Sequence, residues 1–276
     1  MATQIPSSQQ AGGGTVDLQM SEHARVLLQP GKVIKADRVT AIPAPYHDRL
    51  SGVNIEITHL WLWPQSAQVT ATVRYQTGLF SKKEEVVPFS AGAPREPAKA
   101  NGVELRARMA VFCTDEHHQQ TRYRVGQLEG LTIAARTGLA NGLVVRVRAH
   151  PEADVTRPTD PQAALVPVAG RRLVASQAWV RAVEPEGLVL SAFPAQVASS
   201  VEYLDDWQVR ERIWAILNDN PAIQPYVTWL SLDVKDGVAY LGGRLPEARL
   251  RNSAKQDIWH VPGVVGIEDA LRVEGD

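Results

Sequence analysis

The sequence predicts an α+β protein of several domains: two small β-barrels followed by a module that runs helix, strand, strand, helix, strand. Upstream of residue 200, short alternating apolar and polar runs recur in two units with a similar order, which is typical of strands. From Asp205 onward the apolar residues repeat at helical spacing, and a two-residue turn then separates two alternating strands. A chain of 276 residues is long enough to give two or three domains their own cores.

The first helix of the C-terminal module is predicted to begin at Asp205 and Asp206, whose carboxylates favour a helix N-terminus. Pro221 ends this helix, because proline cannot continue the backbone hydrogen bonds. Between these limits lies one apolar stripe at helical spacing, made of Val209, Ile213, Ile216 and Leu217.

A hairpin, a second helix and a closing strand complete the module. Asp236-Gly237 supplies the hairpin turn, since both central positions of such a turn need positive φ. Pro246 begins the second helix and Pro262-Gly263 ends it. The apolar positions are Leu230, Leu232 and Val234 on the first strand, Ala239, Leu241, Gly243 and Leu245 on the second, Leu250, Ala254 and Ile258 on the helix, and Val264, Ile267, Leu271 and Val273 on the last strand.

The run from Asp236 to Gly243, followed by Val261-Pro262-Gly263-Val264, resembles the BON domain, a family named for bacterial osmotic-stress and nodulation proteins. We expect this domain over residues 201–276. The resemblance implies an αββαβ fold without a catalytic centre, in which both helices cover one face of the sheet. It also implies peripheral binding to phospholipid or to the cell envelope. Asp257 departs from the family, which more often has an apolar residue there.

Upstream of this module we expect a disordered leader over residues 1–24, one strand-rich unit over 25–112, a linker over 113–121 and a second strand-rich unit over 122–200. The two units have a matching order of strands, which indicates an internal duplication. The expected strands are 68–74, 85–88 and 102–107 in the first unit, and 142–148, 164–168 and 187–192 in the second.

The second unit resembles the PRC-barrel, a small β-barrel of the photosynthetic reaction centre H subunit and of a ribosome maturation factor. The residues that carry the resemblance are 125–131, 143–148 and 165–168. The first unit departs at 43–48, where we expect an irregular loop, and it carries Trp61 and Trp63 in a strand.

Composition excludes some classes of protein. The formal net charge of −1 gives no general attraction to nucleic acid or acidic membranes, which makes nucleic acid an unlikely partner. The charge is uneven, with 8 basic against 12 acidic residues from Tyr203 to the end, and 21 against 18 before it. A single cysteine, the absence of a long apolar run and the polar, glycine-rich start favour a cytoplasmic protein without a transmembrane segment.

No motif predicts catalysis, a cofactor or a metal. The best chemical cluster, residues 113–118, offers Cys113 and His117, but it lacks the four converging ligands of a closed zinc site and an orienting group for a nucleophile. Gly12-Gly13-Gly14 follows no strand, so it is no phosphate loop. Glu84-Glu85 reads as exposed charge on an edge strand, and Gly242-Gly243 as room for a helix packed over the sheet.

The tryptophans are the candidate binding residues. At 100° per residue, Trp207 and Trp214 share a stripe beside the apolar face of the first helix. Trp229 and Tyr240 alternate onto the open face of the sheet, where Trp229 would lie across from Arg244 at cation–π distance. Trp259 lies beside the apolar stripe of the second helix.

Three functions remain open at this stage. The first is a non-enzymatic scaffold that binds proteins through these aromatic surfaces, since exposed aromatics anchor interfaces. The alternative is peripheral binding to phospholipid or the envelope, for which a basic patch beside the tryptophans would be the discriminating feature. Only Arg210 and Arg244 are obvious there. The third, ribosome-linked RNA–protein assembly, follows from the PRC-barrel resemblance alone. The oligomeric state is open.

Overall fold

A computed structural model describes residues 18–20, 25–78, 81–97, 100–114, 122–149, 160, 162–235 and 237–273. The chain divides into two compact units. The larger unit runs from Ser21 to Asp205, and the C-terminal unit combines Met1–Met20 with Asp206–Asp276.

The first sheet of the larger unit, here called the N-terminal sheet, is antiparallel with the order β3-β4-β5-β6, and β7 pairs with β4. Its inner face carries the buried residues Ile55, Ile57, Leu60 and Leu62 of β4. Its strands are β3 (Val33–Lys35), β4 (Asn54–Trp63), β5 (Gln68–Gln76), β6 (Lys82–Pro88) and β7 (Val103–Leu105).

The second sheet of the larger unit has the order β12-β13-β8-β9-β10-β11-β14, with β2 paired to β9. Its strands are β2 (Arg25–Leu28), β8 (Ala110–Thr114), β9 (Arg122–Ala134), β10 (Ala140–Val147), β11 (Arg172–Ala175), β12 (Val180–Glu184), β13 (Gly187–Leu190) and β14 (Val201–Glu202). Short helices connect the strands of both sheets: η1 (Ala36–Arg38), α1 (Ala44–Leu50), η2 (Ala163–Val168), η3 (Gln177–Trp179) and α2 (Pro194–Ala198).

The two β-barrels that we expected are not found as closed barrels among the described residues. β2 and β8 come from the first expected unit, yet both pair with β9 of the second, so the sheet extends instead of closing on itself. One hydrophobic core runs from Leu28 to Val197 and draws on both expected units. The larger unit is therefore a strand-rich body with two sheets.

Two local expectations for the larger unit are wrong. Residues 164–168 form the 3-10 helix η2 rather than a strand, because Pro167 has no N–H to give to a sheet ladder. Residues 43–48 do not form an irregular loop, because helix α1 begins directly after Pro43. The backbone N–H groups of Tyr46 and His47 donate hydrogen bonds to the carbonyl oxygen of Pro43.

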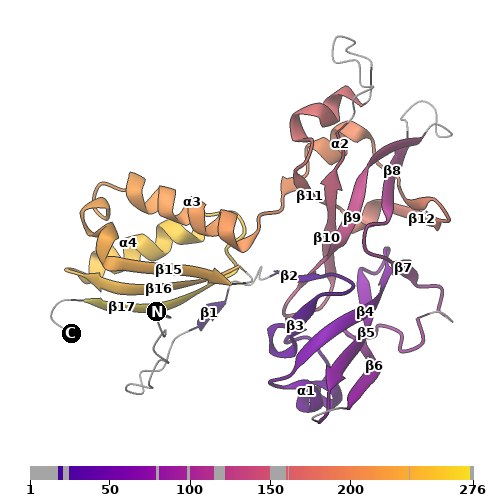
Figure 1. The fold of residues 1–276 in the computed structure, drawn as a ribbon, viewed down its shortest axis with the longest axis horizontal. Coiled ribbons are helices and arrows are strands. Elements are labelled where there is room, and N and C mark those ends of the chain that lie inside the picture. Colours follow the sequence, from indigo (N-terminus) through magenta and orange to yellow (C-terminus); the bar gives the residue numbers. More distant parts are fainter. Residues whose placement is uncertain are drawn as a thin grey trace, which may run out of the picture. The chain divides into compact units, whose positions relative to one another are not determined.

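The C-terminal unit has the expected order of helix, hairpin, helix and strand. Both helices lie on one face of the sheet (Figure 1). Its elements are α3 (Asp206–Asp219), η4 (Gln224–Trp229), β15 (Leu230–Lys235), β16 (Val238–Leu245), α4 (Ala248–Trp259) and β17 (Gly266–Val273). The predicted apolar positions Val209, Ile213 and Leu217 of α3, and Leu250, Ala254 and Ile258 of α4, are buried.

A fourth strand, β1 (Leu18–Met20), extends this sheet from the other end of the chain. It pairs antiparallel with β17, with Leu18 opposite Glu268 and Met20 opposite Gly266. The leader expected over residues 1–24 therefore contributes three ordered residues, and its remaining residues lie outside the described part of the chain.

Local contacts explain the turns of this unit. Gly237 has a φ of 77°, and its N–H donates to Asp206 Oδ1 at 2.8 Å, which ties the hairpin to the start of α3. Asp236 lies outside the described residues. The departure at Asp257 also has a structural reason, because Asp257 Oδ2 accepts a hydrogen bond of 2.6 Å from Asn220 just after α3.

Candidate binding surface

In the described part of the chain, the sheet of the C-terminal unit has one face without a helix, here called the open face. Strand alternation places every second side chain on it, opposite the buried Val234, Ala239, Leu241 and Ile267. The open face carries Ser231, Asp233 and Lys235 of β15, Tyr240, Gly242 and Arg244 of β16, and Glu268, Ala270 and Arg272 of β17.

Two arginines lie side by side at one end of the open face. Arg244 of β16 is in register with Arg272 of β17, and both side chains are exposed. Within the described part of the chain, neither guanidinium pairs with a carboxylate. Like charges directly across two strands are destabilising, so this end of the sheet has an unneutralised positive charge that an anion would relieve.

Trp229 lies at the same end, and its position differs from the expected one. It ends the 3-10 helix η4 instead of belonging to the strand, and its side chain is 55% exposed. Its ring packs against Tyr226, with ring centroids 5.5 Å apart. Among the described residues, the cation–π contacts involve Tyr46 and Tyr203, so the predicted contact with Arg244 is not found.

Gly243 explains why Trp229 lies beside Arg244. This glycine has a φ of 117°, and a Cβ there would lie 2.1 Å from the backbone oxygen of Trp229. The chain entering β15 therefore crosses directly against Gly243. The close approach predicted at Gly242-Gly243 is found at Gly243, but the end of η4 and the start of β15 make it, and not a helix packed over the sheet. We call Trp229, Arg244 and Arg272 the arginine–tryptophan row.

The charges on the open face are segregated. Asp233, Tyr240 and Glu268 face one another across the three strands in the middle of the sheet. A line of small residues, Ser231, Gly242 and Ala270, separates them from the arginines. Adjacent rows are two residues apart along each strand, which is about 7 Å. The acidic row therefore leaves the arginine–tryptophan row accessible to an anion.

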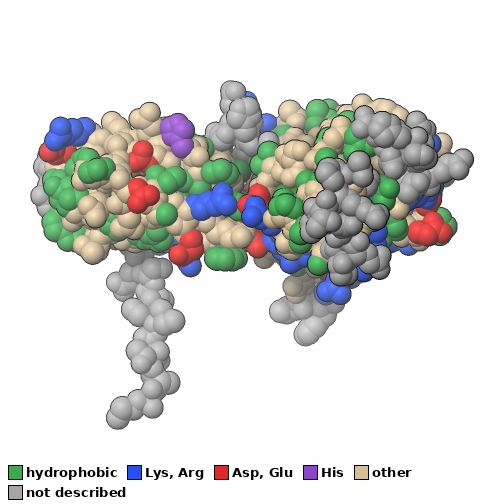
Figure 2. Space-filling model, turned by 90° about the horizontal axis from the view of Figure 1, so that it is seen from above, with side chains coloured by type: hydrophobic (Ala, Val, Ile, Leu, Met, Phe, Trp, Pro, Cys, Tyr) green, Lys and Arg blue, Asp and Glu red, His purple; other side chains and the backbone are tan. Residues whose placement is uncertain are grey.

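The other predicted aromatic residues lie in different environments. Trp207 on α3 is 60% exposed, whereas Trp214, Trp259 and Tyr240 are half-buried. Figure 2 shows the side of the C-terminal unit that bears the helices, where acidic and basic side chains are scattered among hydrophobic ones. The helix side therefore has an exposed tryptophan without a patch of one charge.

Cys113 does not have the environment of a nucleophile. It lies in β8 and is fully buried, and burial raises the pKa of its thiol to about 12. The thiol therefore stays protonated at neutral pH. Residues 115–118 of the predicted cluster lie outside the described residues, among which no group of three or more His, Cys, Asp or Glu side chains could hold a metal ion.

Comparison with known protein families supports the BON domain that the sequence predicts at the C-terminus. Residues 205–275 match the family model of the BON domain. No curated protein matches the chain. The PRC-barrel resemblance of the larger unit is not confirmed by a family match. Among the described residues, no helix has the length and apolar character needed to cross a membrane.

Arg272 and Tyr226 were not among the residues predicted for this surface. Arg272 lies between Leu271 and Val273, two of the apolar positions expected on the last strand, and alternation along a strand places its side chain on the opposite face from theirs. The parallel register that sets Arg272 beside Arg244 could not be read from the sequence. The pairing of Tyr226 with Trp229 depends on η4, which a strand assignment for Trp229 conceals.

Proposed function

We propose that the C-terminal unit is a non-catalytic module that binds peripherally to phospholipid surfaces through the arginine–tryptophan row. The observation that carries the proposal is the in-register pair Arg244 and Arg272, which is exposed and has no carboxylate partner among the described residues. Guanidinium groups bind phosphate in a bidentate manner, and tryptophan concentrates where a membrane meets water. The match to the BON domain, a family associated with phospholipid and envelope binding, supports the same function.

The C-terminal region has more acidic than basic residues, but the two arginines of the row lie together at one end of the open face. A lipid headgroup at this end therefore meets a local positive charge. Each basic residue near an anionic membrane contributes about 1 kcal/mol, so the two arginines contribute about 2 kcal/mol. This is a modest attraction, and burial of the Trp229 side chain at the interface adds to it. The association with the membrane is therefore reversible, and it takes place on the cytoplasmic side.

The test is flotation of the full-length protein with vesicles of zwitterionic lipid alone and with 30% anionic lipid added. We expect binding to the anionic vesicles, with a loss of about thirtyfold in affinity in Arg244→Gln/Arg272→Gln, which corresponds to about 2 kcal/mol. Trp229→Ala should weaken binding to both kinds of vesicle.

The matched control is Arg212→Gln/Arg249→Gln, which removes the same charge from exposed positions on α3 and α4. If this control loses as much affinity as the row variant, general charge and not the open face carries the binding. If wild-type protein does not float with either vesicle, phospholipid binding is rejected.

A second candidate is the protein-binding scaffold, which the exposed Trp207 favours. A side chain of this size with 60% exposure on a helix is a typical interface anchor. The test is chemical cross-linking in cells with Trp207→Ala and Trp229→Ala compared. A partner lost only in Trp207→Ala supports a protein interface on α3, and an unchanged cross-linking pattern rejects it.

RNA–protein assembly stays a prediction of the PRC-barrel resemblance, and the near-neutral charge of the chain speaks against it.

A further inference from the structure

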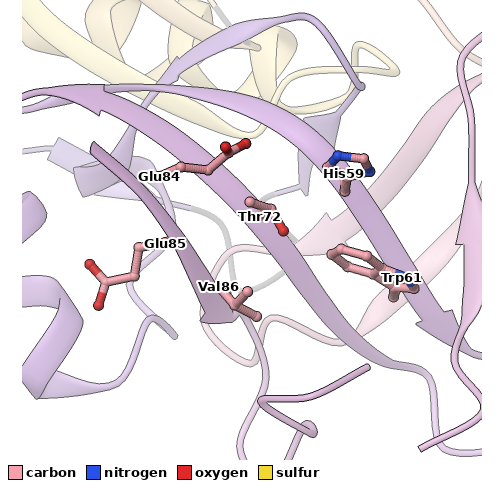
Figure 3. Close-up of a pocket in the computed structure, with 6 residues that line it drawn as sticks. All are labelled: His59, Trp61, Thr72, Glu84, Glu85 and Val86. Carbon is pink, nitrogen blue, oxygen red and sulfur yellow. The ribbon is translucent and has the colours of Figure 1, made fainter. Parts of the chain in front are cut away.

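The outer face of the N-terminal sheet contains a shallow hollow of about 470 Å³, in the larger unit and apart from the row described above. It is lined by His59 and Trp61 of β4, Thr72 of β5, and Glu84, Glu85 and Val86 of β6 (Figure 3). Figure 3 shows Glu85 turned away from the histidine and the tryptophan, and its carboxylate binds Arg49 at 2.7 Å and the Tyr75 hydroxyl at 3.0 Å. The other five side chains are therefore the ones that can contact a ligand in the hollow.

A bulge in β4 brings the two aromatic rings to this face. The β4–β5 register shifts between Ile57 and His59, while Ile57 and Leu60 both stay buried. His59 and Trp61 consequently project outward together and stack, with ring centroids 5.5 Å apart and an interplanar angle of 19°. His59 is held in place by Glu104 of β7, whose carboxylate oxygen lies 3.0 Å from Nδ1. The hollow thus has a fixed aromatic wall.

Carboxylates outnumber cations around this wall. Glu84 accepts a hydrogen bond of 2.7 Å from the Thr58 hydroxyl and lies 3.8 Å from Arg74, which is also 3.6 Å from Glu56. One arginine therefore neutralises two glutamates incompletely, and Glu104 adds a third carboxylate beside His59. The Glu84 side chain remains 46% exposed. An excess of negative charge next to a half-buried indole favours a cationic occupant.

We propose that this hollow binds the guanidinium of an arginine side chain presented by a partner protein. A guanidinium is planar and weakly hydrated, so it can lie against an indole or donate hydrogen bonds to a carboxylate, and the hollow offers both in Trp61 and Glu84. The hollow is too shallow to enclose most of a small molecule, as small-molecule sites do, but it admits one side chain from an opposing surface. Thr72 and Val86 line the floor of the site.

The test uses tetra-arginine peptide as the probe and the indole N–H resonance of Trp61, assigned with Trp61→Phe, as the readout. We expect tetra-arginine to shift this resonance and to bind about two- to fivefold more weakly to Glu84→Gln. Tetralysine should bind more weakly than tetra-arginine to the wild-type protein, because it lacks the planar group. Glu186→Gln removes the same charge from an exposed position outside the hollow and should bind like the wild type.

An unmoved Trp61 resonance at saturating tetra-arginine overturns the proposal. The proposal is also overturned if Glu84→Gln and Glu186→Gln lose the same affinity for tetra-arginine, because the peptide would then bind unspecifically to any exposed carboxylate. Because the Glu84→Gln side chain keeps its size and position, misfolding does not confound this arm of the test. Vesicle flotation of Glu84→Gln should equal that of the wild type, so this site and the arginine–tryptophan row succeed or fail independently.

Discussion

The two candidate surfaces carry charges opposite to those of the regions around them. From Tyr203 to the end the chain has 8 basic and 12 acidic residues, yet its open face ends in two arginines that pair with no carboxylate of the described residues. Upstream the balance is 21 basic to 18 acidic residues, yet three glutamates and one arginine lie in or beside the hollow on the N-terminal sheet. Screening limits charge interactions to about 8 Å at physiological salt, so a ligand responds to the local arrangement and not to the sum.

The two surfaces also differ in the backbone features that position their side chains. The arginine–tryptophan row depends on strand register and on one glycine that lets the chain approach closely. The hollow depends on a bulge that brings two aromatic rings to one face and on a carboxylate that holds the histidine. In both cases the backbone geometry, and not an exposed loop, fixes the side chains.

The largest expected effect comes from a substitution that unfolds one of the two units while the other stays folded. Ile213→Ala removes a fully buried side chain from α3 and should destabilise the C-terminal unit by about 2–5 kcal/mol. Hydrogen exchange under native conditions should then report faster opening of residues 206–273 alone. Leu143→Ala, at a fully buried position of β10, is the matched control and should open the larger unit alone. Joint opening of both regions in either variant would contradict independent cores.

A second prediction concerns the pH dependence of the larger unit. In the unfolded chain the Cys113 thiol has a pKa of 9.0, whereas burial in the folded protein raises this pKa to about 12. The unfolded state therefore binds fewer protons in this window, and stability falls as the pH rises, by about 1.4 kcal/mol per pH unit from this one group. Urea unfolding between pH 8 and 11 should show the extra slope, and Cys113→Ala should lack it. Equal slopes in the two proteins would contradict the burial of the thiol.

A third prediction concerns a small change in stability. A single substitution in the row should raise the stability of the C-terminal unit and lower its affinity for vesicles. Arg272→Glu replaces a like-charged pair with Arg244 by an opposite-charged one, which should stabilise the C-terminal unit by about 0.2–1 kcal/mol. Vesicle binding should fall in the same variant. Thermal unfolding and flotation measure the two quantities. A variant that is both less stable and weaker in binding would mean that the arginines have a structural role instead.

The C-terminal unit was predictable from sequence because its signals are local. The turn at Gly237, the stripe of α3 and the ends of both helices each depend on a few consecutive residues. The larger unit was not, because its architecture depends on distant pairings such as Leu27 with Thr132 and the parallel pairing of Val111 with Leu188. No local pattern specifies those partners.

The same distinction applies to the sites. Alternation in the sequence indicated correctly that Arg244 faces outward, but its neighbour Arg272 required the register of β16 and β17. Trp229 was placed wrongly because a 3-10 helix ends where a strand was expected. The hollow escaped prediction because the residues that line it come from three strands and meet only across the folded sheet.

The most direct test of the account is to ask which face of the C-terminal unit meets a lipid surface. Cys113 is the only cysteine and is buried, so an introduced cysteine can be labelled selectively with an environment-sensitive fluorophore. We predict that a probe at Ala270→Cys, on the open face, reports an apolar environment when anionic vesicles are added, and that one at Gln256→Cys, on α4, does not. A response from Gln256→Cys without one from Ala270→Cys would contradict the account.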